Sequence, residues 1–194
     1  MHILEKKTDR PPARPSWRSL TVRWIVTFAG FPAGGFTAML IVGPVNSVTT
    51  ALAGGLITGL ILGAAQAWGL GWPRPGAIRW IAATAAGLTA GLGAGAALVG
   101  FGTSLAALAV QGAVCGLVLG AAQAAVLRRA IGRIAWAWPA VLAAVWALGW
   151  AVTYAAGVAV DEQFTVFGSS GAIIVTALTV VLPIVIRTTG GKQP

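Results

Sequence analysis

Charged side chains are scarce in this sequence, and the residues most often used in catalysis are nearly absent. Only 9% of the 194 residues are charged, against about 25% in an ordinary soluble domain. One cysteine, Cys115, and one histidine, His2, exclude an intrachain disulfide and a zinc site built from Cys and His ligands. No ionisable residue falls near the middle of a long apolar run, so an intramembrane proton relay or nucleophile–base pair lacks its residues. We therefore expect no catalytic activity, cofactor or metal.

The chain is instead rich in apolar residues and glycine. Hydrophobic residues make up 57% of it, and the mean hydropathy is +0.85. Because this leaves too little polar surface for a soluble protein, the composition predicts an all-α protein with several membrane spans. The net charge of +9 is concentrated at the chain ends and in short loops. That distribution is typical of membrane topology, and we expect no nucleic-acid partner.

Six apolar runs have about the 20 residues that a membrane-spanning helix needs. The predicted spans are about 20–43, 48–70, 78–99, 104–127, 136–159 and 169–187. They divide the chain into a basic cytoplasmic tail (1–19), a six-helix transmembrane domain (20–187) and a short C-terminal tail (188–194). Pro32 and Pro183 lie inside the first and last spans, where proline is expected to kink a helix.

The placement of basic residues predicts the orientation of the chain. All thirteen Lys and Arg residues lie in segments that six spans put on one side of the membrane, whereas Asp161 and Glu162 lie on the other. By the positive-inside rule both termini face the cytoplasm, and we expect a bacterial plasma-membrane protein. The basic tail is interpreted as a topology anchor or, alternatively, as a contact for anionic lipid or a partner. Tryptophans near the basic side predict an interfacial belt: Trp24, Trp68, Trp72, Trp80, Trp136 and Trp138.

An internal repeat organises the spans. Residues 55–67 and 112–124 are identical at nine of thirteen positions. Arg-Trp-Ile opens the first and third spans, and a tryptophan opens the fifth, so the repeating unit is a two-span hairpin present three times. The third copy has Val-Leu-Pro at 181–183 where glutamine is expected. Because each unit has two spans, the hairpins are parallel, and we expect a pseudo-threefold arrangement about the membrane normal.

Glycines recur every four residues on three of the predicted spans. In a helix this spacing places them on one face, where missing side chains let a neighbouring backbone approach closely. We therefore expect three helix-packing ridges: Gly55, Gly59 and Gly63; Gly87, Gly91 and Gly95; and Gly112, Gly116 and Gly120. The spacing leaves open whether each ridge packs within the chain or against another chain.

The uncharged polar residues form the candidate polar site. Gln66 and Gln123 close the two matched copies, about one turn from the basic side. They could line a polar vestibule for a headgroup or solute, or each amide could bond a neighbouring backbone or an interfacial tryptophan, worth about 1 kcal/mol or less. Span threonines, including Thr84 and Thr179, are interpreted as bonding their own helix. Cys115 occupies the position of Thr58 in the repeat and is interpreted as a small packing residue.

The end of the second matched copy carries a resemblance. Gly120, Gln123, Leu127 and Arg128 form a Gly-x-x-Gln-x-x-x-Leu-Arg ending, whereas in the first copy Leu70 is followed by glycine instead of arginine. This hairpin ending resembles that of small glycine-rich bacterial multi-pass proteins without assigned function. The resemblance implies a multi-pass hairpin fold and no particular activity. In size, span count and topology the chain is also similar to the substrate-binding components of energy-coupling vitamin transporters.

These observations favour a non-catalytic membrane protein over two alternatives. The leading hypothesis is a structural or accessory protein that packs, through its glycine ridges, into a homo-oligomer or a larger membrane complex. One alternative is a small-solute or vitamin-type transport component with an uncharged intramembrane site, and the other is an anionic-lipid-binding protein. A sealed bundle axis favours the first hypothesis, and an outward-open polar pocket under the Asp161–Ser170 loop favours the second.

Overall fold

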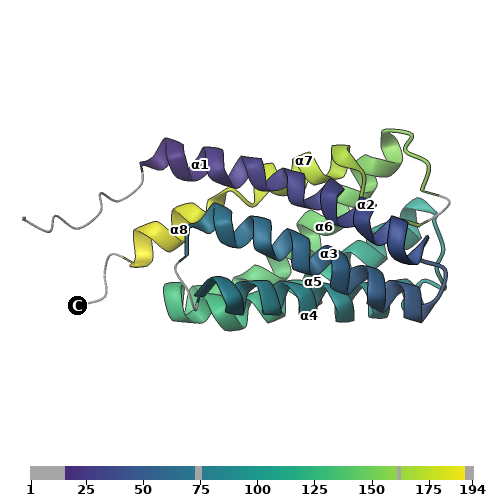
Figure 1. Ribbon diagram of the computed structural model, residues 1–194, viewed down its shortest axis with the longest axis horizontal. Coiled ribbons are helices and arrows are strands. Elements are labelled where there is room, and N and C mark those ends of the chain that lie inside the picture. Colours follow the sequence, from purple (N-terminus) through teal and green to yellow (C-terminus); the bar gives the residue numbers. More distant parts are fainter. Residues whose placement is uncertain (1–15, 73–75, 161–162, 191–194) are drawn as a thin grey trace, which may run out of the picture.

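A computed structural model describes residues 16–72, 76–160 and 163–190, and every regular element in these residues is a helix (Figure 1). In chain order the elements are α1 (Trp17–Val26), η1 (Thr27–Ala29), α2 (Gly30–Val42), α3 (Val48–Leu70), α4 (Gly76–Leu98), α5 (Leu105–Ile131), η2 (Gly132–Ala137), α6 (Trp138–Ala155), α7 (Ser169–Leu178) and α8 (Val181–Gly190). The sequence-based expectations for residues 1–15, Arg74, Asp161, Glu162 and 191–194 concern residues outside this described part.

Five helical stretches in the described residues are long and apolar enough to cross a membrane, so the chain is a multi-pass integral membrane protein. They are Trp17–Val42, Val48–Leu70, Gly76–Leu98, Leu105–Ala155 and Ser169–Thr189. The fourth stretch is 51 residues long but reverses direction within η2. Its two halves, α5 and α6, are antiparallel, since Gly112 contacts Trp150 while Gly120 contacts Pro139.

Apart from α1 with α2 and α7 with α8, which continue each other within one stretch, consecutive helices pack side by side in opposite directions. Between α3 and α4, Gly55 lies against Thr89, whereas Gly63, further along α3, lies against Ile81, nearer the start of α4. The same antiparallel pattern joins α2 to α3 and α4 to α5. Helix α1 contacts α8 and α2 contacts α7, so the first and last membrane-spanning stretches close the bundle around a common core (Figure 1).

The first and last stretches are each interrupted close to the proline that the sequence places there. Proline lacks an N–H group, and its ring clashes with the carbonyl four residues earlier. For Pro32 that carbonyl belongs to Phe28, which lies in the 3₁₀ turn η1 between α1 and α2. For Pro183 it belongs to Thr179, in the break between α7 and α8. The kinks predicted at both prolines are therefore present as breaks in the regular helix.

The chain between α6 and α7 differs from the sequence-based expectation. The sequence predicts a span to residue 159 and then a loop on the side opposite the basic residues. In the structure α6 ends at Ala155, and the described residues that follow fold into the end of the bundle opposite the basic one. The buried side chains here are Val160, Gln163, Thr165, Val166 and Phe167. The backbone N–H of Val45 donates to the carbonyl of Gln163 at 2.9 Å and fixes the segment beside α2. Burial of its apolar side chains stabilises this inward path.

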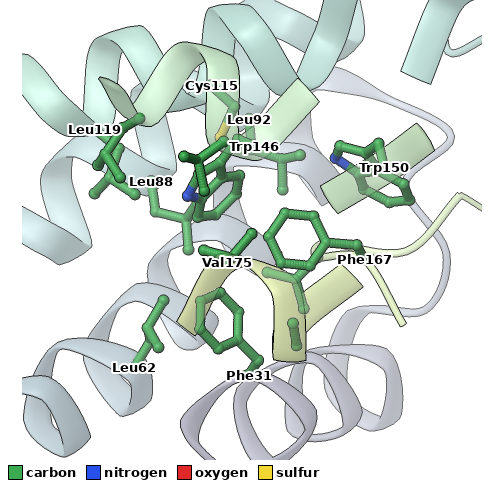
Figure 2. Packing of buried hydrophobic residues seen from close by; sticks show 14 of the residues in the cluster. Phe31, Leu62, Leu88, Leu92, Cys115, Leu119, Trp146, Trp150, Phe167 and Val175 are labelled. Carbon is green, nitrogen blue, oxygen red and sulfur yellow. The ribbon is translucent and has the colours of Figure 1, made fainter. Parts of the chain in front are cut away.

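Aromatic side chains fill the centre of the bundle (Figure 2). The Phe167 ring lies edge-on to Trp146 at 4.9 Å and to Trp150 at 5.8 Å, and its centroid is 5.5 Å from that of Phe31. Such tilted and edge-to-face pairs add roughly 0.5–1.5 kcal/mol each beyond their burial. The surrounding apolar side chains include Leu62, Leu88, Leu92, Leu119 and Val175. The segment that sequence reasoning placed in a loop between the fifth and sixth spans thus supplies one of the central rings of the bundle.

Candidate functional site

All nine ridge glycines are buried, and each ridge packs against the next helix of the same chain. The α3 ridge faces α4, the α4 ridge faces α5, and the α5 ridge faces α6. A Cβ atom added at Gly59 would lie 2.6 Å from the Cα of Ala85, and one added at Gly91 would lie 3.0 Å from the Cα of Cys115. Carbon atoms pack best at about 3.5–4.0 Å, so neither position accepts a side chain without movement of a helix. The ridges therefore join helices within the chain.

Gln123 is the centre of a buried hydrogen-bonded cluster toward the basic end of the bundle. Its Nε2 donates to the Oγ1 of Thr84 at 3.0 Å and to the Oε1 of Gln66 at 3.4 Å. The indole Nε1 of Trp138 donates to the Oε1 of Gln123 at 2.8 Å. The structure thus brings the two candidate glutamines together and connects α3, α4, α5 and α6 through them. The bond from a tryptophan to a glutamine, one of the two sequence-based alternatives, is made by Gln123.

A second tryptophan makes the equivalent bond at another point of the bundle. The Nε1 of Trp24 donates to the Oγ1 of Thr179 at 3.2 Å. The third hairpin lacks a glutamine, and in it Thr179 accepts an indole N–H. In the second hairpin Gln123 does the same. The indole of Trp80, at the corresponding position of α4, is fully buried, and its N–H has no hydrogen-bond partner among the described residues. Two of the three related indoles are thus paired, and the third lines, together with Gln66, a small cavity inside the bundle.

This cavity is small and lies on the bundle axis. Its volume is about 10 Å³, and its lining comes from α1 to α7. A cavity needs roughly 10–15 Å³ to hold one water molecule, so the space admits nothing larger. The lining residues are Trp24, Phe31, Gln66, Trp80, Leu119, Gln123, Trp138, Leu142, Trp146, Val175 and Thr179, all of them apolar, aromatic or neutral polar. The arrangement can exchange hydrogen bonds, but none of these side chains is an acid or a base.

The structure corrects the predicted interfacial belt at three positions. Trp24, Trp80 and Trp138 are 1%, 0% and 7% exposed, so they lie inside the bundle and not against lipid. They are drawn inward because the rings fill the axis and two of the indole N–H groups find buried acceptors. Trp72 is half-buried and packs edge-on against Trp80, with ring centroids 5.3 Å apart.

The other two belt residues face outward, and an arginine guanidinium lies over the ring of each. Trp68 and Trp136 are 52% and 54% exposed. The guanidinium of Arg23 lies 4.9 Å from the ring centroid of Trp68 and donates to the Trp68 carbonyl oxygen, and that of Arg128 lies 5.2 Å from the ring of Trp136. Cation–π pairs at exposed sites contribute about 0.5–1 kcal/mol each. These pairs mark the basic end of the bundle.

Sequence reasoning missed the part that two threonines play in the polar cluster. Thr179 bonds its own helix through the Val175 carbonyl at 2.7 Å, as the sequence suggests, but it also accepts from Trp24. Thr84 accepts from Gln123 on another helix. The sequence indicates such a role only through the position of Thr84, because Thr84 follows Trp80 by about one helical turn. That spacing puts both side chains on one face, but it does not show which helix the face meets.

Comparison with known proteins found no match, since no protein-family model, curated protein or solved structure matches this chain. The resemblance of the Gly120–Arg128 ending to small bacterial membrane proteins therefore stays a prediction.

Proposed function

We propose that the chain crosses the membrane six times as three parallel hairpins related by a pseudo-threefold axis. The reversal between α5 and α6 divides the 51-residue stretch into two crossings, which supports the count. The equivalent bonds Trp24–Thr179 and Trp138–Gln123 support the threefold relation. The basic end then faces the cytoplasm of a bacterium and both termini lie on that side of the plasma membrane, in agreement with the positive-inside rule.

We further propose a non-catalytic, structural or accessory role for this bundle. The observation that carries the proposal is the packed axis, on which aromatic rings and a bonded amide cluster leave about 10 Å³ of space. A small-solute carrier needs a site large enough to enclose its substrate, and ligand pockets are typically about 300–1,000 Å³. The geometry therefore favours a self-contained helical scaffold over a transport component with an axial site.

The glycine ridges face other helices of the same chain, and this determines which surface can bind a partner protein. Because the ridges are occupied within the chain, contacts with a homo-oligomer or a larger complex must use the outer face of the helices. That face carries large apolar side chains, among them Phe36, Leu40 and Leu98 at 67%, 71% and 67% exposed. Binding of anionic lipid by the basic tail, residues 1–19, stays a further prediction.

Two measurements on the intact chain test this role. Cross-linking in native membranes followed by gentle extraction and native mass spectrometry should recover an oligomer or a partner protein, with cross-links on the outer face. The purified chain reconstituted alone in liposomes should show no more solute flux than empty vesicles. Substrate-specific flux through the chain alone would replace the structural proposal by the transport alternative.

A further inference from the structure

A groove opens sideways at the outer end of the bundle, away from the axial polar cluster. Its volume is about 510 Å³, within the roughly 300–1,000 Å³ typical of ligand pockets. One wall is α2, with Phe31, Phe36 and Met39, and the other is the buried segment before α7, with Phe164 and Val166. In Figure 1 this is the region where the end of α2 approaches the non-helical chain that leads into α7.

The groove follows from the early end of α6 and the late start of α7. Thirteen positions, 156–168, separate the two helices, and the described residues among them take the place of a helix beside the outer half of α2. This chain lies directly on α2, because a Cβ atom added at Gly35 would be 2.8 Å from the Cγ2 of Val166. A single non-helical length of chain fills less volume than a helix about 10 Å across. The remaining space is the groove.

The chemistry of the walls points to an amphiphile. The α2 wall is apolar and continues into the lipid-facing surface, where Phe36 is 67% exposed and Leu40 is 71% exposed. Two serines line the α7 side: Ser169 is exposed, whereas the Oγ of Ser170 is buried behind the wall and has no hydrogen-bond partner among the described residues. None of the lining side chains is charged. A ligand would therefore place an apolar chain on α2 and a neutral hydrogen-bond acceptor near the serines.

We propose that the groove binds one acyl chain of a glycerolipid from the surrounding bilayer, with the ester group beside Ser169 and Ser170. The bilayer is the source because the groove is continuous with the surface that the membrane spans present to lipid. The non-helical backbone adds a second reason. Irregular backbone is tolerated at membrane depth only where it is buried in protein or lines a polar cavity, because lipid chains cannot bond its N–H and C=O groups. Within the described residues, none of the N–H groups of residues 164–168 forms a hydrogen bond to another backbone carbonyl. A bound ester would supply acceptors to this segment.

Photo-crosslinking of lipid tests the proposal on the intact chain. The protein is reconstituted in nanodiscs of phosphatidylcholine carrying a diazirine on one acyl chain, irradiated, and mapped by peptide mass spectrometry. We expect adducts concentrated on the α2 wall, from Phe31 to Met39, and on residues 163–170. Adducts spread evenly over all lipid-facing helices would overturn the proposal.

A matched pair of variants separates the groove from general lipid contact. Ala156 is exposed and lines the groove, so Ala156→Trp should fill it and reduce groove adducts severalfold. Ala97 is exposed at the outer end of α4, away from the groove, so Ala97→Trp should leave them unchanged. Met39→Trp fills the groove from the opposite wall and serves if Ala156→Trp does not fold. Equal labelling in the filled and control variants contradicts lipid binding, and a dimeric mass with an unlabelled groove shows instead that a second copy covers it.

Discussion

Gly59 is the position where an added side chain tests the helix packing most sharply. A Cβ atom there would lie 2.6 Å from the Cα of Ala85 and 3.0 Å from the carbonyl oxygen of Thr84. Because both contacts are backbone, relief requires α3 and α4 to separate by roughly 0.5–1 Å to restore ordinary contact distances. Gly59→Ile adds three further carbon atoms to this contact. We expect a loss of about 1–3 kcal/mol in the stability of the monomer, the usual cost of overpacking.

A control on the same helix shows whether isoleucine is tolerated on α3 where no neighbouring helix packs. Ala64 follows the ridge residue Gly63 but is exposed to lipid, so Ala64→Ile should change stability by about 0.5 kcal/mol or less. The native thiol provides the assay, since Cys115 is the only cysteine and is 1% exposed. A thiol-reactive fluorophore therefore reports unfolding in detergent. If Gly59→Ile unfolds at the same temperature as the wild type and Ala64→Ile, the close approach of α3 and α4 is refuted.

Three further predictions follow from the polar cluster and the topology. Gln123→Leu removes three hydrogen bonds and should lower the free energy of unfolding by about 1–2 kcal/mol. Gln66→Leu loses only the 3.4 Å contact with Gln123 and should lower the free energy of unfolding by under about 1 kcal/mol. Equal losses of thermal stability in the two variants would argue against the cluster. Thr179→Ser should unfold at the wild-type temperature and Thr179→Val below it, because only serine keeps the acceptor; two indistinguishable variants would argue against the indole bond. In a background without the native cysteine, an impermeant thiol reagent applied to intact cells should label Ala159→Cys and not Ala130→Cys, and the reverse pattern would invert the orientation.

The glycine ridges show what local sequence pattern can predict. Four-residue spacing fixes which residues share a helix face, and the absence of side chains on that face permits close approach whatever the partner is. The identity of the partner depends on how the helices close into a bundle, which no local pattern encodes. The spacing thus predicted the packing residues Gly59 and Gly116 but left their neighbours, Ala85 and Leu142, to be found in the structure.

The tryptophans and the segment before α7 show where the sequence misleads. A tryptophan near a basic loop is typical of an interfacial belt, but Trp24 and Trp138 have buried acceptors on other helices of the bundle, which the local sequence does not reveal. Phe164, Val166 and Phe167 give the expected outer loop an apolar content that could have indicated burial. Their insertion beside Gly35 depends on the early end of α6, which helix propensity alone does not fix.

The central claim is that the glycine-ridged helices pack within one chain, and an engineered disulfide tests it most directly. A Cβ atom added at Gly93 of α4 would lie 3.4 Å from the Cγ of Leu52 on α3, so cysteines at these two positions would face each other across the contact between the helices. In a background without the native cysteine, the Leu52→Cys and Gly93→Cys pair should oxidise in native membranes and migrate as a monomer without reductant. Moving the first cysteine to Leu60, about 12 Å further along α3, should abolish the bond. A disulfide-linked dimer, or no bond in either pair, would contradict packing within the chain.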